Sequence, residues 1–486
     1  MCAQPSRVIM FLAVAAALST VAPRPARATL DEPTHDALLK LEAVLEMADL
    51  SDDLWPSWDI SETPFVLLSR DSTCYLVNHP RPPVYFERVR EDTDLRTHLY
   101  AAAARDVPTA GDCVLEDVPT GVLEAWRAGG EMLPLAFEAG FRAHCSSLCE
   151  DRMAPIELLS GYPVDAWNLV LADIECRLLH RAVNAPDDSL DICVREFASV
   201  RRHRRLRMGG RYAEFERRIE FTEGIPAYLA ERCRREAGPY VGGRYGRRLR
   251  ESLGTPGALD RCFPESPGLD WYRAERFRWT GAVICSMMDR YLPDWKEVAR
   301  SDCVDAFEIL WREVKGALPL ASVVLERYGY EDLVASMTTT IEQSKSDAER
   351  MFESIVRTEG RTFSVATHLL ASGEVRFDPT EVHKVDEHRE VNTGLFKVEY
   401  SGGTHVYVTG IPVAIVLGDD EFDYRTLVVE LPEEYSIVMD GVELDATDGV
   451  YEFMRSLEVT APGFEVVAAS GTIMVGERGA TFVLHR

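Results

Sequence analysis

Residues 164–182 read Val-Asp-Ala-Trp-Asn-Leu-Val-Leu-Ala-Asp-Ile-Glu-Cys-Arg-Leu-Leu-His-Arg-Ala, and they indicate how the N-terminal part of the chain folds. Apolar side chains recur in this stretch every three or four positions, which is the spacing of one face of an α-helix. The residues of this apolar stripe are Trp167, Leu171, Ile174 and Leu178. Asp165 precedes the stripe and is a residue type that caps the N-termini of helices. We therefore predict an amphipathic helix over 164–182.

Helical periodicity continues on both sides of this helix, from Asp31 to about Gly360. The further helices that we predict begin at Pro186, cover 212–236 with a break at Pro226, and cover 333–357. Two short runs of strand-forming residues, 64–69 and 74–78, predict a small sheet within this helical body.

The pattern changes after Arg361, where short β-branched runs alternate with turns. The predicted strands are 396–400, 405–409, 412–417, 426–431, 436–439 and 442–444. Asp440-Gly441 lies between the last two, and Asp-Gly is a strong signal for a type I′ hairpin turn. The chain is therefore predicted to be α+β. A helical domain over 29–360 is followed by an antiparallel β domain over 361–486, which we expect to be a sandwich.

The composition limits the class of protein. Of the 486 residues, 46% are hydrophobic and 27% are charged, which excludes collagen-like and wholly disordered chains. The formal net charge is −27. A protein that binds duplex DNA needs a basic face, so this charge predicts that no nucleic acid is a partner.

The first 28 residues have the three parts of a secretory signal peptide. Arg7 supplies the positive region, 8–22 are apolar, and Ala26-Arg27-Ala28 is a small-x-small cleavage site. The apolar stretch is shorter than the roughly 20 residues that span a bilayer, which favours a cleaved signal over a transmembrane anchor. Cleavage after Ala28 predicts a secreted or periplasmic protein, and an uncleaved anchor is the alternative.

Cysteine usage agrees with export. The chain has eleven cysteines, and those that follow the predicted signal lie between Cys74 and Cys303. Their number is even, which in an oxidising compartment predicts disulfide bonds, although the spacing leaves the connectivity open. No Cys-x-x-Cys pair occurs, so neither a zinc ribbon nor a thioredoxin-like site is predicted.

Several short segments occur in an order that carries a resemblance. The segments are Trp55-Pro56-Ser57-Trp58-Asp59, Tyr75-Leu76-Val77-Asn78-His79-Pro80, Gly161-Tyr162-Pro163, Arg195-Glu196-Phe197, Phe215-Glu216, Glu223-Gly224-Ile225-Pro226-Ala227-Tyr228 and Arg278-Trp279-Thr280-Gly281. Their order resembles a family of exported bacterial proteins that contain a gluzincin-type metallopeptidase domain. The match covers most of 50–300, and Phe377-Asp378-Pro379 extends it loosely into the C-terminal domain.

The resemblance implies a zincin-like helical body with a zinc centre. Such families carry His-Glu-x-x-His on one helix and a third ligand, a glutamate, in a later Glu-Gly-x-Ala-x-Tyr segment. Two histidines four residues apart lie on one helix face and bind zinc through neutral imidazoles. The glutamate between them acts as the general base that activates the metal-bound water.

This chain departs from that pattern in the predicted helix over 135–144. Phe137 and Phe141 stand at the histidine positions, Glu138 at the general-base position, and Glu223 at the position of the third ligand. A phenyl ring offers no lone pair to a metal. We therefore expect no metal and no other cofactor, unless the zinc centre has been rebuilt from other ligands. Glu138 is then a vestigial catalytic residue.

The same helix can be interpreted as a core element. Leu133, Phe137, Phe141 and Cys145 follow one another at intervals of four, which makes a continuous apolar stripe. The alternative is a shaped pocket that has lost its metal. The pocket candidates, carried over from the resemblance, are Phe137, Phe141, Glu175, Glu223 and Tyr228.

Two of these candidates are glutamates that interrupt apolar stripes. A buried charge is costly unless it is paired, so Glu175 predicts a basic partner. Glu223 predicts either an arginine partner, for example Arg218, or exposure caused by the break at Pro226. His144 follows Glu138 by six positions, which places it on another helix face.

A basic run, 201–205, adds a further expectation. We predict a solvated helix face whose charge is answered by acidic residues downstream. Those residues are Glu214, Glu216 and Glu220.

Three functions compete. The first is an exported metallopeptidase-like protein that has lost zinc catalysis and binds a peptide or protein partner. The second is an active hydrolase whose non-standard centre uses Glu138, Glu223 and either His144 or Glu175, which requires these groups to converge. The third is a structural or scaffolding secreted protein with the β domain as its docking unit, which predicts no deep pocket.

Overall fold

The computed structural model describes residues 30–486 apart from short stretches. Those stretches are 71–72, 90–97, 104–106, 108–112, 129–130, 149–157, 159–160, 242–249, 251–262, 265–266, 270, 303, 317, 359–360, 367–371, 378–380, 387, 395, 401–403, 418–423, 433, 445–448, 454, 469–470, 477–478 and 485–486. The predicted signal peptide therefore lies outside the described residues, as do Cys149, Cys262, Cys303 and Asp378-Pro379.

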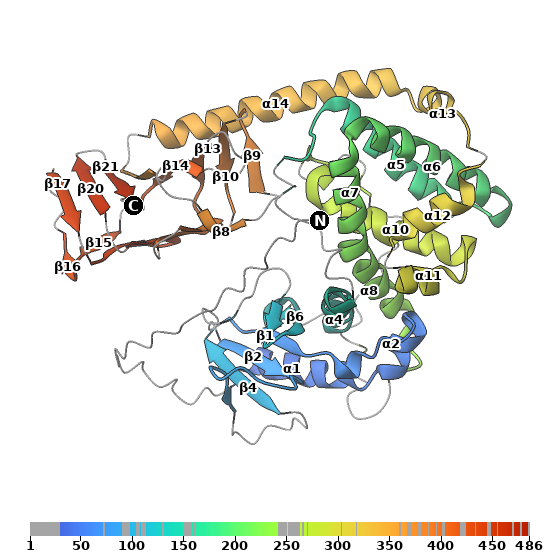
Figure 1. Cartoon of the computed structure of the whole chain (residues 1–486), viewed down its shortest axis with the longest axis horizontal. Coiled ribbons are helices and arrows are strands. Elements are labelled where there is room, and N and C mark those ends of the chain that lie inside the picture. Colours follow the sequence, from blue (N-terminus) through green and yellow to red (C-terminus); the bar gives the residue numbers. More distant parts are fainter. Residues whose placement is uncertain are drawn as a thin grey trace, which may run out of the picture.

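The N-terminal body is mainly helical, as the periodicity predicts (Figure 1). Its helices are α1 (Glu32–Leu45), α2 (Ala48–Leu54), α3 (Ala125–Ala128), α4 (Met132–Leu148), α5 (Ala166–Asn184), α6 (Asp187–Met208), α7 (Gly210–Ile219), α8 (Ile225–Glu236), α10 (Arg276–Tyr291), α11 (Trp295–Asp302), α12 (Ala306–Val314) and α13 (Ala321–Arg327). Asp165 caps α5 as expected, since its carboxylate accepts a hydrogen bond from the Asn168 amide at 3.0 Å.

The body also contains a sheet that is larger than the two predicted strands. Its described strands are β1 (Phe65–Leu68), β2 (Thr73–Val77), β3 (Glu87–Arg88), β4 (Leu99–Ala103), β5 (Cys113–Leu115) and β6 (Val118–Glu124), in the order β3-β4-β2-β1-β6-β5. Alternate residues of β1 face opposite sides. Phe65 and Leu67 join the main helical core, whereas Val66 packs in a smaller core with Leu76.

The predicted helix over 212–236 is divided into α7, a π-helical segment Glu220–Gly224, and α8. The division coincides with a close crossing against α10. A Cβ atom added to Gly224 would lie 2.5 Å from the Cα atom of Gly281, so only glycine fits on both sides of this contact. Pro226 lies in the first turn of α8, directly after this π-helical segment.

The C-terminal unit consists of two facing sheets, which confirms the α+β prediction. One contains β7 (Thr362–Ala366), β9 (Val382–Lys384), β10 (Arg389–Asn392), β13 (Val413–Leu417), β14 (Tyr424–Glu430), β17 (Gly449–Phe453), β20 (Gly471–Gly476) and β21 (Gly479–Leu484). The other contains β8 (Ser372–Phe377), β11 (Phe396–Tyr400), β12 (Thr404–Val408), β15 (Ser436–Met439), β16 (Val442–Glu443), β18 (Leu457–Ala461) and β19 (Phe464–Ala468). The neighbouring strands are antiparallel, except that β21 pairs in parallel with β7.

The hairpin prediction is confirmed at the turn between β15 and β16. Asp440 has a φ of 51° and Gly441 a φ of 81°. Two successive positive φ angles are the signature of a type I′ turn, which Asp-Gly adopts at low cost. The interior of the sandwich is made of alternating apolar residues such as Val365, Val406 and Leu427.

Helix α14 (Tyr330–Val356) connects the two parts of the molecule. Figure 1 shows it extending from the helices of the body to the sheets of the C-terminal unit. Its N-terminal half contacts α5, and its C-terminal end packs Phe352 and Ile355 against Val391 and Ala414 of the sandwich. One helix therefore contributes to the packing of both parts.

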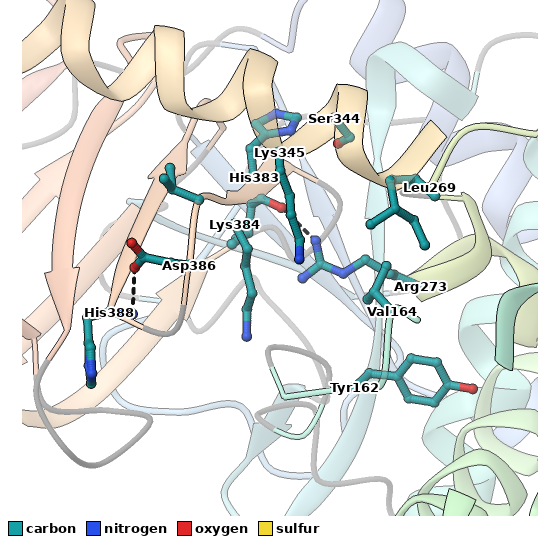
Figure 2. Close-up of a pocket in the computed structure, with 13 residues that line it drawn as sticks. Tyr162, Val164, Leu269, Arg273, Ser344, Lys345, His383, Lys384, Asp386 and His388 are labelled. Carbon is teal, nitrogen blue, oxygen red and sulfur yellow. Dashed lines mark hydrogen bonds between the residues drawn. The ribbon is translucent and has the colours of Figure 1, made fainter. Parts of the chain in front are cut away.

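A cavity of about 620 Å³ lies where α14, the body and β9 meet (Figure 2). The Arg273 guanidinium, from a π-helical segment Trp271–Glu275 before α10, donates a hydrogen bond to the Val382 carbonyl oxygen at 2.6 Å. This bond ties the body to the strand that borders the cavity.

Candidate functional site

Helix α4 places Phe137 and Phe141, which the resemblance aligns with histidine positions, in the hydrophobic core. Phe137 and Phe141 are fully buried. The Trp58 ring meets both edge-on, with ring centroids 5.4 Å and 5.1 Å away, and the Trp55 ring lies 4.9 Å from that of Phe141. The tryptophans of the Trp-Pro-Ser-Trp segment thus fill the space beside the two histidine positions, and the packing interpretation of this helix is supported.

Glu138 lies in a different environment on the same helix. Glu138 is only 6% exposed, and both of its carboxylate oxygens accept hydrogen bonds from arginines. Arg278 of α10 donates from its two terminal nitrogens at 2.5 and 2.7 Å, a bidentate ion pair. Arg142, one turn along α4, contributes a third bond at 3.2 Å. A carboxylate held in this way is not available as a general base or as a metal ligand unless an arginine leaves.

Glu223 reaches the same place from the π-helical segment. Its carboxylate accepts a hydrogen bond from Arg142 Nη2 at 2.6 Å, so Arg142 bridges Glu138 and Glu223. The prediction that an arginine pairs with Glu223 is confirmed, but this partner is Arg142 of α4, whereas Arg218, the example named from the sequence, pairs with Glu214. The side chains of Arg142 and Glu223 are 28% and 33% exposed, so solvent reaches this ion pair.

The other candidates do not complete a catalytic set. The His144 ring packs beside the rings of Trp58 and Phe141, and burial lowers the pKa of its imidazole to about 4. The Tyr228 hydroxyl donates to Asp289 at 2.6 Å, and burial raises its pKa. Both residues are therefore neutral at neutral pH.

These residues do not fit a zinc ion. The two positions at which the resemblance implies imidazole ligands carry buried phenyl rings, and the two carboxylates are paired with guanidinium groups. Within the described ranges, no group of three or more His, Cys, Asp or Glu side chains is arranged to hold a metal. We define the cluster of Glu138, Arg142, Glu223 and Arg278 as the arginine-bridged centre.

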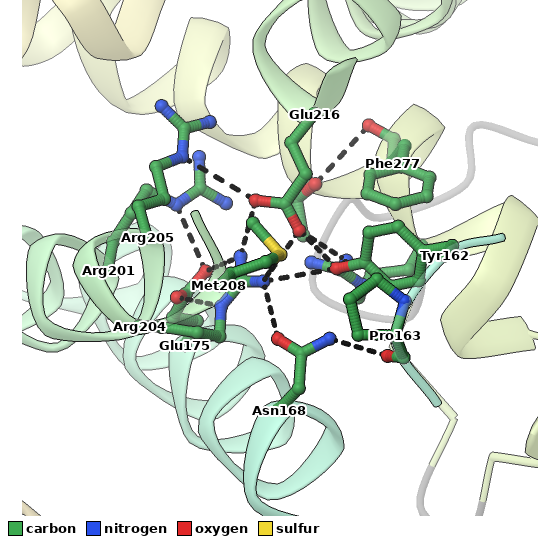
Figure 3. A network of polar contacts seen from close by, with 12 residues as sticks. Tyr162, Pro163, Asn168, Glu175, Arg201, Arg204, Arg205, Met208, Glu216 and Phe277 are labelled. Carbon is green, nitrogen blue, oxygen red and sulfur yellow. Dashed lines mark hydrogen bonds and ion pairs between the residues drawn. The ribbon is translucent and has the colours of Figure 1, made fainter. Parts of the chain in front are cut away.

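A second and larger ion network lies deeper in the body (Figure 3). Glu175 of α5 accepts hydrogen bonds from Arg204 Nε at 2.6 Å and from Arg201 Nε at 3.0 Å. Glu220 accepts a bidentate pair from Arg201, with both bonds at 2.8 Å. The expectation that Glu175 has a basic partner is confirmed.

Glu216 is the other acidic member of this network. It accepts from Arg204 Nη2 at 2.8 Å and from Arg276 Nη2 at 2.9 Å, and the Tyr162 hydroxyl also donates to it. Burial alone raises the pKa of Glu216, but Arg204 and Arg276 outweigh this effect and hold its pKa well below the ordinary value. The network, which we call the buried Glu–Arg network, comprises Tyr162, Glu175, Arg201, Arg204, Glu216, Glu220 and Arg276.

The basic run 201–205 is only in part the solvated face that we predicted, since Arg202 is exposed. Arg201 and Arg204 are fully inaccessible to solvent, because α6 turns them toward α5 and α7. Two of the expected acidic partners, Glu216 and Glu220, are confirmed. Arginine stays protonated under all ordinary conditions, so these pairs fix geometry rather than transfer protons.

Sequence reasoning missed the arginines that satisfy the site. Arg142 follows Glu138 by four residues, which is the spacing of a helical ion pair. This pair could therefore have been predicted from the sequence. Arg276 and Arg278 lie far from their partners in the chain, so no local spacing indicates them.

Four of the segments that carry the family resemblance contribute to these two clusters. Tyr162 and Glu216 belong to the buried Glu–Arg network, whereas Glu223 and Arg278 belong to the arginine-bridged centre. Asn78 holds a nearby turn, with its amide donating to the carbonyl oxygens of Ser61 and Thr63 at 2.7 and 3.0 Å.

Cysteine side chains are buried wherever the structure describes them. Cys113, Cys176, Cys193, Cys233 and Cys285 are present as thiols. Disulfide bonding stays a prediction, because three of the cysteines it concerns lie outside the described residues.

Comparisons with protein-family models, with curated proteins and with solved structures give no match to this chain. The family resemblance thus depends on the quoted segments alone. Among the described residues, no helix combines the length and the apolar character that crossing a membrane requires.

Proposed function

We propose that this chain is an exported protein with a metallopeptidase-like body that has lost zinc catalysis and acts by binding a peptide or protein partner. The observation that carries the proposal is the arginine-bridged centre. Arg142 and Arg278 pair with Glu138 and Glu223, the carboxylates that such a fold would use with zinc. The positive charge that a metal ion would bring to this position is supplied by two guanidinium groups.

Two further features support a binding role. The signal-like sequence that ends at Ala28 directs the chain out of the cytoplasm. Outside the cytoplasm, peptides and other exported proteins are available as partners. The cavity of about 620 Å³ at the junction has the volume of an ordinary ligand site, which is consistent with a binding role.

The first test is the metal content of the protein. The full chain is exported, purified without added metal, and analysed by mass spectrometry for bound zinc, beside Glu138→Ala and Glu223→Ala. Glu313→Ala, which changes an exposed glutamate at the end of α12, is the matched control. We expect zinc far below one ion per chain in all four proteins, and no peptide cleavage that a chelator abolishes.

One zinc ion per chain, lost in Glu138→Ala or Glu223→Ala but kept in Glu313→Ala, would overturn the proposal. The active-hydrolase alternative would then stand, and one observation already favours it: Glu138 and Glu223 converge on Arg142.

The second test addresses binding itself. The chain is immobilised and exposed to a peptide mixture from a proteolytic digest, and the retained peptides are identified by mass spectrometry. We expect a specific subset of peptides to be retained without cleavage. A second column carries the Ser344→Glu variant, whose cavity has an added charge. If the wild-type column retains no peptide in greater amount than this variant column, the cavity has no peptide-binding role and this part of the proposal fails.

A further inference from the structure

Strand β17 forms a sheet edge that lacks the usual protection against further pairing. It is the terminal strand of the eight-stranded sheet, and among the described strands only β20 pairs with it. Figure 1 shows β17 at the far left, at the end of the C-terminal unit away from the helical body. The backbone N–H and C=O groups on the outer side of such a strand can template one more strand.

The other described sheet edges are short, charged or irregular. β3 and β16 have two residues each, and β5 has three. β9 also has three and receives the hydrogen bond from Arg273. β8 has six, but it contains Glu374 and Arg376, and its register shifts between Glu399 and Tyr400 of β11. β17 contains no lysine, arginine or proline, and it pairs with β20 over five residues without a register shift.

The exposed face of β17 has an apolar position beside an acidic one. Val450 is 69% exposed, and Met474, its cross-strand neighbour on β20, is 41% exposed. Glu452 is exposed two residues further along β17, so its side chain lies on the same face as that of Val450. Among the described residues, no cation forms an ion pair with Glu452. A strand added to β17 therefore meets one apolar side chain and one carboxylate on this face.

Charge indicates which kind of strand fits this edge. Residues 440–452 include five acidic residues and no lysine or arginine, in a chain whose net charge is −27. Two copies of the chain repel each other through this charge. If two β17 strands paired antiparallel around Tyr451, Glu452 would face Val450 of the second copy rather than a cation. A basic segment, in contrast, is attracted to this edge.

We propose that β17 binds an extended basic peptide segment as an additional antiparallel strand, with a lysine or arginine opposite Glu452 and an apolar residue opposite Val450. Antiparallel pairing is slightly more stable per residue than parallel pairing, and it sets the order of the segment as cation, any residue, apolar residue. Main-chain hydrogen bonds supply the affinity, and alternate side chains supply the specificity. The inference rests on the proposed function for the peptide nature of the partner, but it uses a surface apart from the junction cavity and the arginine-bridged centre.

The test is fluorescence anisotropy of a labelled nine-residue peptide that is titrated with the full chain at low salt. The probe consists of threonine, apart from a central valine and one lysine two positions before it. A second peptide has glutamate in place of the lysine. We expect one site per chain for the lysine peptide and at least about fivefold weaker binding of the glutamate peptide, because opposite charges across a strand pair attract and like charges repel. Equal affinities, or no binding of the lysine peptide with a Kd below about 1 mM, would overturn the proposal.

Backbone methylation shows whether the peptide adds as a strand. N-methyl groups on alternate residues remove the N–H donors from one edge of the peptide only. Methylation of one alternate set should abolish binding and methylation of the other set should not, since only one edge of the probe faces β17. Equal affinity of the two methylated peptides would refute strand addition.

Variants show whether the probe uses this edge. Glu452→Lys should reverse the preference, so that the glutamate peptide binds more tightly than the lysine peptide. Glu458→Lys, which changes an exposed glutamate on β18 of the other sheet, is the matched control and should keep the wild-type preference. An unchanged preference in Glu452→Lys would place the peptide elsewhere and end the proposal. Circular dichroism shows that each variant is folded.

Sedimentation velocity tests whether a second copy occupies the edge instead. We expect a monomer, and a dimer that Val450→Lys dissociates would assign β17 to a second copy and overturn the proposal. Ser344→Glu should bind the probe as the wild type does, since Ser344 lines the junction cavity. Binding at β17 can therefore fail while peptides are still retained at the cavity, and the reverse result is equally distinguishable.

Discussion

The two Glu–Arg clusters of the helical body use the same side chains in different surroundings. In the buried Glu–Arg network, the side chains of Glu175, Arg201 and Arg204 have no solvent exposure. In the arginine-bridged centre, Arg142 and Glu223 are about one third exposed. Charges without access to water depend wholly on one another, whereas exposed charges can exchange a partner for solvent. The comparison indicates that the first cluster holds the fold together and that the ion pair of Arg142 and Glu223 in the second can exchange a partner for water.

The largest effect is expected from Arg204→Ala. This change leaves Glu175 and Glu216 buried with fewer partners, and breaking a buried ion pair costs about 3–5 kcal/mol. Urea denaturation followed by circular dichroism measures the free energy of unfolding. Arg202→Ala is the control, since Arg202 is exposed on the same helix and loses mainly its contact with the Trp311 ring. Equal losses in the two variants would refute the structural role of the network.

Acidification should act on the same network. The pKa of Glu175 and that of Glu216 are lower in the folded protein than their ordinary value of 4.5, because Arg204 and neighbouring arginines outweigh the effect of burial. Their contribution to stability is complete above pH 4.5 and is lost as the pH falls below it. Each carboxylate should contribute about 1.4 kcal/mol per pH unit in that range.

The measurement is the free energy of unfolding at several pH values between about 5 and 3. Glu216→Gln should reduce the slope by the share of one carboxylate. A wild-type slope near zero, or a slope that Glu216→Gln leaves unchanged, would show that these groups do not titrate as the structure implies.

Phe141→Ala tests whether α4 is held by its aromatic face rather than by its carboxylate. The ring is fully buried between Trp55 and Trp58, so its removal should cost about 3–4 kcal/mol through lost contacts and the cavity left behind. Ile192→Ala, at an exposed apolar position on α6, should cost less than about 1 kcal/mol. Thermal and urea unfolding compare the two variants.

The Glu138–Arg278 pair should show a smaller but measurable coupling. A double-mutant cycle with Glu138→Gln and Arg278→Gln is expected to give about 1–2 kcal/mol, because the bidentate pair has one nearly buried partner and one that is 33% exposed. A coupling near zero would show that this pair contributes no more to stability than an ordinary surface ion pair. The Glu138–Arg278 pair would then not differ in strength from the Glu223–Arg142 pair.

The smallest effect is expected for Glu223 and Arg142. A cycle with Glu223→Gln and Arg142→Gln should give less than about 1 kcal/mol, since both side chains are solvated. A coupling above about 2 kcal/mol would show that this pair is as strong as a buried one, and the contrast between the two clusters would fail.

Local patterns predicted most of the fold, but not the arginine contacts of the site. The helix over 164–182 and the Asp440-Gly441 hairpin depend on residues that are close in sequence, so periodicity and turn chemistry indicate them. The burial of Arg201 and Arg204 depends on Glu175, 26 and 29 residues away. From their charge alone, these arginines are expected to be exposed to solvent. They are buried because α5, α6 and α7 pack together around them.

The same reason limited the prediction at the candidate site. The replacement of both histidine positions by phenylalanine was visible from the resemblance, and the structure places both rings in the core. The partner of Glu138 on α10 lies 140 residues away, and no spacing rule reaches that far. The cavity likewise draws on residues from 162 to 388 and exists only after the parts have assembled.

The parallel pairing of β21 with β7 has a consequence for biosynthesis. β7 is made first among the strands of the sandwich, and β21 leaves the ribosome more than 100 residues later. At about 5–20 residues per second, one edge of β7 remains unpaired for about 6–23 s. Unpaired edges join other chains readily. Until β21 is available, this edge of β7 is therefore a place where the incomplete sandwich can pair with another chain.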